Sequence, residues 1–182
     1  LSSDIRWATD GSERSQIDLC IDLLLSNLTR CITMEFYRLS FDSHEDNDAK
    51  QSSNFSELFS FLQQLCHRLK ESPGIYTSSL FDEVCIVVLS EMGRTPHLNG
   101  GKGKEHWYHT SGMMIGSGIQ GGQSIGGFSD YFYGEAIDLA SGHVSADGVE
   151  ITPRILGATL LGLADIDPME ELGLSGITGL YS

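Results

Sequence analysis

The sequence predicts an α/β protein in which a mostly parallel sheet is flanked by helices. Residues 83–90 contain an uninterrupted apolar run, which is typical of a strand that is buried on both faces in the centre of such a sheet. Helical periodicity precedes and follows this run, starting near Ser12, Asn54 and Thr152. The 182 residues are enough for a single domain, 1–182, with a sizeable core.

Each of the three predicted helices has a start signal, a stop signal, or both. The first ends near Asn27. The second begins at an Asn54 cap and stops at Pro73-Gly74, and the third has a Thr152 cap followed by Pro153. The predicted apolar faces comprise Ile17, Cys20, Ile21, Leu24, Leu25 and Leu28 in the first helix, Phe55, Leu58, Phe59, Leu62, Leu65, Cys66 and Leu69 in the second, and Ile155, Leu156, Thr159, Leu160 and Leu163 in the third.

The segments between these helices are predicted to be strands and loops. Residues 31–37 and 110–116 have strand-like composition. The acidic stretch 45–53 is expected to be a mobile loop, and residues 1–11 and 169–182 are expected to be tails. The glycine- and lysine-rich segment 97–109 predicts a loop whose backbone lies close to a neighbouring group.

Composition excludes some classes of function. The chain carries 25 acidic and 11 basic residues, a formal net charge of −14, which repels a nucleic-acid backbone. No apolar run approaches the ~20 residues that cross a bilayer. The four cysteines, Cys20, Cys31, Cys66 and Cys85, lie in apolar patterns without a C-x-x-C pair. They are predicted to be buried free thiols and do not identify a compartment.

Polar residues that can bind metal or anions follow three strand-like segments. Asp42 and His44 are two residues apart, so an extended chain would place both on one side. Glu91 with Arg94, and Glu105 with His106, make up the other two groups. Mixed carboxylate and imidazole ligands suit Zn²⁺ or Mn²⁺, and an arginine can hold a tetrahedral anion. The alternative is that these are surface residues and that Glu91 simply pairs with Arg94. His67 is interpreted as a surface or packing histidine.

A formal G-x-G-x-x-G occurs at residues 116–121. Dinucleotide binding would require a helix to begin there. More glycines and a polar, aromatic segment follow instead, so the pattern favours a glycine-rich turn over a dinucleotide-binding oxidoreductase.

Four motifs stand in a familiar order: Phe41-Asp42-Ser43-His44, Ser90-Glu91-Met92-Gly93-Arg94-Thr95-Pro96, Gly103-Lys104-Glu105-His106-Trp107, and the glycine run that starts at Gly116. Together they resemble domain of unknown function 1501, a bacterial family of sulfatase-like proteins related to the alkaline phosphatase superfamily. The resemblance runs from about residue 15 to residue 168, and the Ser-Glu-Met-Gly-Arg-Thr-Pro block is its most specific part.

The resemblance implies a partial sulfatase-like fold and one or two divalent metals, Zn or Mn, with Ca or Mg as further candidates. Asp42, His44, Glu91 and His106 would be the ligands, and Glu105 would orient His106. The implied activity is hydrolysis of small phosphate or sulfate esters, with Arg94 binding the anion. Export to the bacterial periplasm or cell surface, often by the twin-arginine route, is implied as well.

Nothing before Asp42 matches the early strand that carries the nucleophile in that superfamily. We therefore expect this chain to correspond to the C-terminal half of such a protein, with the nucleophile outside it. The rival hypothesis is a non-catalytic surface or binding module that retains the sulfatase-like fold. An incomplete sheet would expose an edge, through which the chain could form homo-oligomers.

Overall fold

The computed structural model describes residues 13–35 and 39–182. Where a single domain is expected, the chain divides into two compact units. The first contains the residues up to 84 together with 97–105, and the second contains 85–96 and 106–182. The predicted tail at 1–11 and part of the predicted strand at 31–37 lie outside the described residues.

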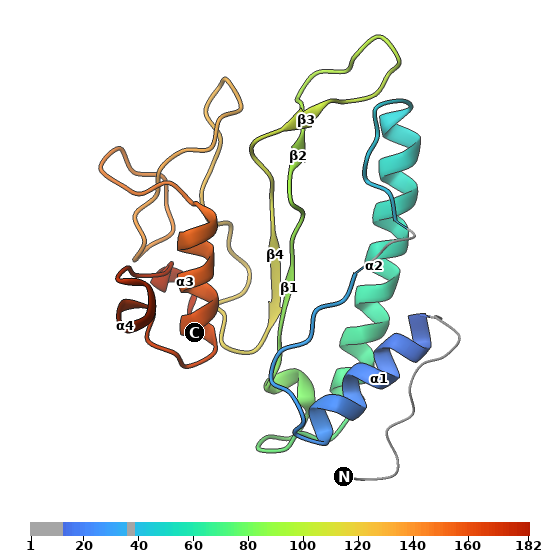
Figure 1. Cartoon of the computed structure of the whole chain (residues 1–182), viewed down its shortest axis with the longest axis vertical. Coiled ribbons are helices and arrows are strands. Elements are labelled where there is room, and N and C mark those ends of the chain that lie inside the picture. The colour runs from blue at the N-terminus through green and yellow to red at the C-terminus, as the bar shows by residue number, and fades with distance from the viewer. Residues whose placement is uncertain (1–12, 36–38) are drawn as a thin grey trace. The chain divides into compact units, whose positions relative to one another are not determined.

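Two packed helices form the core of the first unit. Helix α1 (Glu13–Leu25) lies across the C-terminal half of α2 (Asn47–Glu71), and Asp18 of α1 accepts a 2.7 Å hydrogen bond from Arg68 of α2 (Figure 1). A short 3₁₀-helix, η1 (Leu80–Asp82), packs against α2. The prediction of the first helix is confirmed. Among the described residues of this unit, the buried apolar side chains are Ile17, Cys20, Ile21, Leu58, Phe61, Leu62, Leu65, Leu69 and Leu80.

The prediction of a mobile loop at 45–53 is wrong, because α2 begins at Asn47 and not after Asn54. The first two turns of α2 are polar, so hydrophobic periodicity cannot reveal them. They are held by hydrogen bonds: the Asn47 backbone N–H donates to the Lys102 carbonyl at 2.9 Å. Asn54 is not a cap, since its side-chain amide donates to the Ser40 carbonyl at 2.6 Å.

The buried face of α2 is rotated from the predicted one. Phe61 is 1% exposed, whereas Phe55 and Phe59 are 44% and 52% exposed. Phe55 instead contacts the rings of Phe41 and Phe59, with centroids 5.0 and 6.0 Å away. Leu58, Leu62, Leu65 and Leu69 are buried as predicted. The helix ends at Glu71, just before Pro73-Gly74, as expected.

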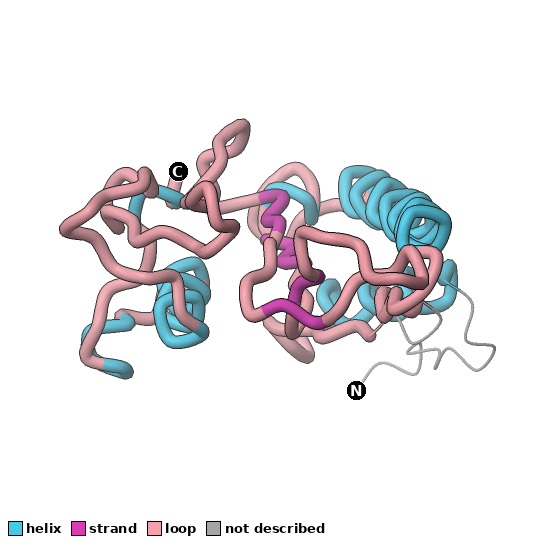
Figure 2. Tube along the Cα trace, turned by 90° about the horizontal axis from the view of Figure 1, so that it is seen from above, coloured by secondary structure: helices cyan, strands magenta, loops and turns pink. Residues whose placement is uncertain are grey.

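The second unit contains the strands, and they correct the predicted fold class. Strand β1 (Cys85–Val88) pairs antiparallel with β4 (Met113–Gly116), and β2 (Gly93–Arg94) pairs antiparallel with β3 (His106–Trp107). Within the described residues there are only these two small two-stranded sheets and no parallel sheet. The strands are short segments among longer stretches of helix and loop (Figure 2). The apolar run of β1 is half-buried rather than central, because in the part of the chain that the structure describes it pairs with one strand, β4.

The other part of the second unit packs around three buried isoleucines, Ile137, Ile155 and Ile177. Helix α3 (Pro153–Leu163) begins as predicted, with the Thr152 hydroxyl accepting a hydrogen bond from the Ile155 N–H at 3.3 Å. The prediction that residues 169–182 form a tail is wrong. This segment contains most of α4 (Pro168–Leu172) and all of η2 (Thr178–Leu180), and Ile177 is only 3% exposed.

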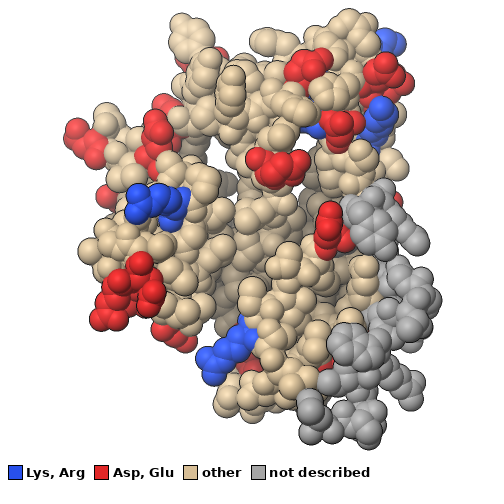
Figure 3. Space-filling view, viewed as in Figure 1, with Lys and Arg blue, Asp and Glu red and all other residues tan. Residues whose placement is uncertain are grey.

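Several local predictions are also decided. Residues 31–35 are irregular rather than a strand, and residues 117–122 form turns and coil without a helix. All four cysteines are free, but Cys31 is exposed and only Cys20 is buried. In the described part of the chain, every helix is too short or too polar to cross a bilayer. On the face shown in Figure 3, acidic side chains are scattered and basic ones are few.

Candidate metal centre

The segment that carries Asp42 and His44 is fastened to the start of α2 by the residue between them. Ser43 is fully buried, and its hydroxyl donates to the Asn47 side-chain carbonyl at 2.8 Å. The amide of Gln51 donates to the Ser43 hydroxyl and to the Phe41 carbonyl, both at 2.9 Å. With Ser43 anchored in this way, the flanking side chains of Asp42 and His44 are held together on the other side of the segment.

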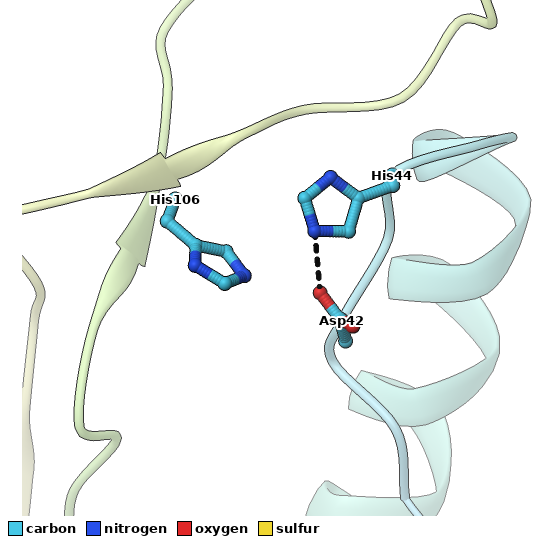
Figure 4. Close-up of side chains that lie close together, drawn as sticks. All are labelled: Asp42, His44 and His106. Carbon is cyan, nitrogen blue, oxygen red and sulfur yellow. Dashed lines mark ion pairs between the residues drawn. The ribbon is translucent and has the colours of Figure 1, made fainter.

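His44 lies between two carboxylates in the first unit. Its Nε2 is 3.0 Å from Asp42 Oδ1, the contact drawn in Figure 4, and its Nδ1 is 2.8 Å from Glu105 Oε2. The predicted neighbourhood of Asp42 and His44 is therefore confirmed, and Glu105 joins it. All three side chains are roughly half-exposed, so as plain ion pairs they would add little stability in solvent.

Loop 97–105 brings Glu105 to His44, and Asn99 organises that loop. The Asn99 side-chain amide donates to Glu105 Oε1 at 2.7 Å and to the His44 carbonyl at 2.9 Å. The Asn99 side-chain oxygen accepts hydrogen bonds from the Gly101 and Gly103 N–H groups, both at 2.9 Å. One side chain thus joins the loop, the carboxylate and the histidine backbone.

Close backbone packing completes the attachment of the loop. A Cβ at Gly103 would overlap the carbonyl of His44 and the amide nitrogen of Glu45. The Lys104 N–H donates to the Ser43 carbonyl at 2.9 Å, and Glu45 bridges Lys102 in an antiparallel pair. The prediction that the glycine-rich loop wraps close to another group is confirmed, and that group is the backbone around His44.

The donor set of Asp42 and His44 fits a metal. A neutral imidazole donates from one ring nitrogen only, so an Nδ1–H bound to Glu105 leaves the lone pair on Nε2. A carboxylate that fixes the non-ligating nitrogen is the usual support of a metal-bound histidine. In tetrahedral Zn²⁺ coordination, ligand atoms about 2.0–2.2 Å from the ion lie about 3.3 Å apart. The observed 3.0 Å between His44 Nε2 and Asp42 Oδ1 is near that separation.

The other predicted residues belong to the second unit. Arg94 and His106 are direct partners across β2 and β3, which places their side chains on one face of that ladder. Glu91 is exposed. It accepts a long hydrogen bond of 3.4 Å from the Ser90 hydroxyl. Its role as a metal ligand stays a prediction.

The model of the family described as Protein of unknown function (DUF1501) matches residues 19–171, more than half of the chain. The chain belongs to this family. Membership in DUF1501 confirms that part of the sequence resemblance. No curated protein and no solved structure matches the chain. The link to sulfatases and alkaline phosphatases therefore remains a prediction for this DUF1501 member.

Sequence reasoning missed two parts of the site. It gave Glu105 the task of orienting His106, and it did not predict the 2.8 Å contact of Glu105 with His44. It also passed over Asn99, although an asparagine followed by glycines is a recognised signal for a side chain that hydrogen-bonds its own turn. The signal predicts the contacts of Asn99 to Gly101 and Gly103. It does not predict those to Glu105 and His44, which depend on how the loop packs in the fold.

Proposed function

We propose that this DUF1501 member binds a divalent metal through Asp42 and His44, with His106 as a third ligand, and hydrolyses phosphate or sulfate esters there. The observation that carries the proposal is the placement of His44 between the carboxylates of Asp42 and Glu105. His106 is included because the family resemblance implies it as a ligand and because it is a histidine that directly follows Glu105 in the chain.

Each residue has a separate task in this proposal. Glu105 accepts the Nδ1–H of His44 and so directs Nε2 of that ring toward the metal. When bound, a metal of the Zn²⁺ or Mn²⁺ type would polarise an ester oxygen and lower the pKa of a coordinated water. Ca²⁺ and Mg²⁺ are less suited to two imidazoles, because they prefer all-oxygen ligands.

Arg94 is the proposed anion-binding residue. Its guanidinium can form two parallel hydrogen bonds to a tetrahedral phosphate or sulfate group. The pairing of Arg94 with His106 across the β2–β3 ladder supports this role, since it puts the cation next to a proposed ligand. Charge that develops on the ester in the transition state would be stabilised by the same group. The substrate is accordingly a small anionic ester.

A second candidate function is a non-catalytic binding module that uses the metal only for stability. It is favoured by the several hydrogen bonds that join loop 97–105 to residues 43–47. These bonds have a structural role whether or not a substrate binds. In that case a metal would fasten Asp42 to the loop-supported His44. The family resemblance also implies export to the periplasm or cell surface, which fractionation of the producing bacterium would test. Homo-oligomers, which are expected from an exposed sheet edge and not from the resemblance, would be tested by light scattering.

The deciding experiment measures metal content and turnover on the full-length gene product. Wild-type protein should carry stoichiometric zinc or manganese after reconstitution, and His44→Ala should lose it. His67→Ala is the matched control, because His67 is an exposed histidine that pairs with Glu71 on α2 at 3.0 Å. If wild type binds no metal under any loading, the proposal is wrong.

Turnover separates the two candidate functions. Hydrolysis of an aryl phosphate or aryl sulfate that is lost in both His44→Ala and Arg94→Ala supports the enzyme. Stoichiometric metal without turnover of either ester supports the binding module instead.

A further inference from the structure

We propose that Asn99 is the positioning residue of this metal centre, acting through Glu105 and His44; the inference rests on the proposed metal binding. Asn99 has no ligand role in the proposed centre. Its side-chain amide nitrogen donates to Glu105 Oε1 at 2.7 Å and to the His44 carbonyl at 2.9 Å. Asn99 therefore holds both the carboxylate of Glu105 and the backbone of His44, and these two groups set the direction of the His44 imidazole.

The two ends of the Asn99 side chain have different tasks. The oxygen accepts hydrogen bonds from Gly101 and Gly103 and shapes the loop. The nitrogen donates to the carboxylate and to the histidine backbone, and so shapes the site. This division makes the positioning role separable from the structural one, because a substitution can remove the donor and keep the acceptor.

The donor matters because Glu105 is exposed. Its side chain is 56% accessible to solvent, and its Oε2 is the carboxylate oxygen that contacts His44 Nδ1. The bond from Asn99 fixes the second oxygen, so the carboxylate cannot rotate away from Nδ1 without losing a hydrogen bond to a charged group. Outer partners of this kind typically change metal affinity by about 10–100-fold when they are removed.

Asn99→Asp is the decisive variant. The aspartate retains an oxygen for Gly101 and Gly103, so the turn is preserved. It loses the donor and places a second negative charge against Glu105. We expect the affinity for Zn²⁺, measured by competition with a chromophoric chelator, to fall by about 10–100-fold. The visible absorption of the Co²⁺-loaded protein, which reports the coordination of His44, should shift or weaken.

A reciprocal substitution provides the rescue. In the double variant Asn99→Asp/Glu105→Gln, the glutamine nitrogen donates to the aspartate introduced at position 99, while the glutamine oxygen accepts from His44 Nδ1. The hydrogen bond between the two positions is thus restored with its polarity reversed. Because the hydrogen bond to the His44 carbonyl is not restored, the double variant should recover part of the lost affinity and of the Co²⁺ spectrum. The pair forms a double-mutant cycle with a positive coupling between positions 99 and 105.

The outcomes distinguish this inference from the proposed function. If wild type binds no Zn²⁺ or Co²⁺, the metal centre itself is refuted. If wild type binds metal and Asn99→Asp binds it with unchanged affinity, the positioning role is refuted and the metal centre stands. If Asn99→Asp loses affinity but the double variant recovers none of it, the effect is loop disruption, and the positioning role is again refuted.

Discussion

Gly103→Ala tests whether loop 97–105 is held against His44 as closely as the structure shows. The added methyl would occupy the space of the His44 carbonyl and the Glu45 amide nitrogen. Neither is a flexible side chain, so the loop backbone must move. Gly100 lies in the same loop with nothing near its missing Cβ, which makes Gly100→Ala the matched control.

The expected loss of stability follows from the steric overlap and from the hydrogen bonds that are strained or broken. Overpacking a rigid contact costs roughly 1–3 kcal/mol. Movement of the loop also strains or breaks the Asn99–Gly103 hydrogen bonds and the 2.9 Å bond from Lys104 to Ser43, each worth about 0.5–1.5 kcal/mol. We therefore expect Gly103→Ala to reduce the free energy of unfolding of the first unit by about 2–5 kcal/mol.

Urea unfolding followed by far-UV circular dichroism is the assay, because α1 and α2 are the longest helices of the described chain and lie in this unit. The midpoint should fall in Gly103→Ala and remain near the wild-type value in Gly100→Ala. Weakened Zn²⁺ binding should accompany the first variant only. Equal midpoints for the two variants would refute the close packing of the loop on His44.

Three further predictions concern the cores and one carboxyl group. Phe61→Ala should lower the free energy of unfolding by about 3–5 kcal/mol, whereas Phe59→Ala, at an exposed position of the same helix, should change it by less than about 1 kcal/mol in the same urea assay. Thr159→Val should destabilise by about 1–3 kcal/mol in thermal unfolding, because the backbone N–H of Ile177 loses the buried hydroxyl that accepts its hydrogen bond. Hydrogen bonds from the Ser141 hydroxyl and N–H lower the pKa of Asp138 below its ordinary value. The resulting stabilisation is present above the ordinary, unfolded-state pKa and is lost as pH falls through the lower folded-state pKa. An NMR titration of Ser141→Ala should show the Asp138 pKa raised toward its ordinary value, and an unchanged pKa would contradict the assignment.

Local signals predicted the parts of the fold that local physics decides. Helix α3 begins where a threonine cap and a proline at the first position place it, because both act within one turn. Helix α1 follows from apolar spacing alone. The start of α2 could not be found in this way, since the backbone N–H groups of Asp46 and Asn47 donate to the carbonyls of Gly101 and Lys102, far along the chain.

The prediction of the fold class was wrong for a related reason. An apolar run such as Cys85–Val88 indicates that a strand is at least partly buried, but it does not indicate which other segments cover the strand. A strand in the centre of a parallel sheet and a strand in a two-stranded antiparallel ladder can have similar apolar sequences, because other parts of the fold can cover either one. Only the tertiary structure shows that this strand pairs antiparallel with Met113–Gly116 and, among the described residues, with no other strand.

The sequence by itself determined that Asp42 and His44 would be neighbours, because residues two apart in an extended chain project to one side. It also determined membership in DUF1501 through the order of short motifs. Only the tertiary structure decided that Glu105 supports His44 and that Asn99 holds both. Those contacts join loop 97–105 to His44, and Asn99 is 55 positions from His44 in the chain. They depend on the close approach of the two backbones at Gly103. No local pattern encodes such an approach, because it depends on how distant segments pack.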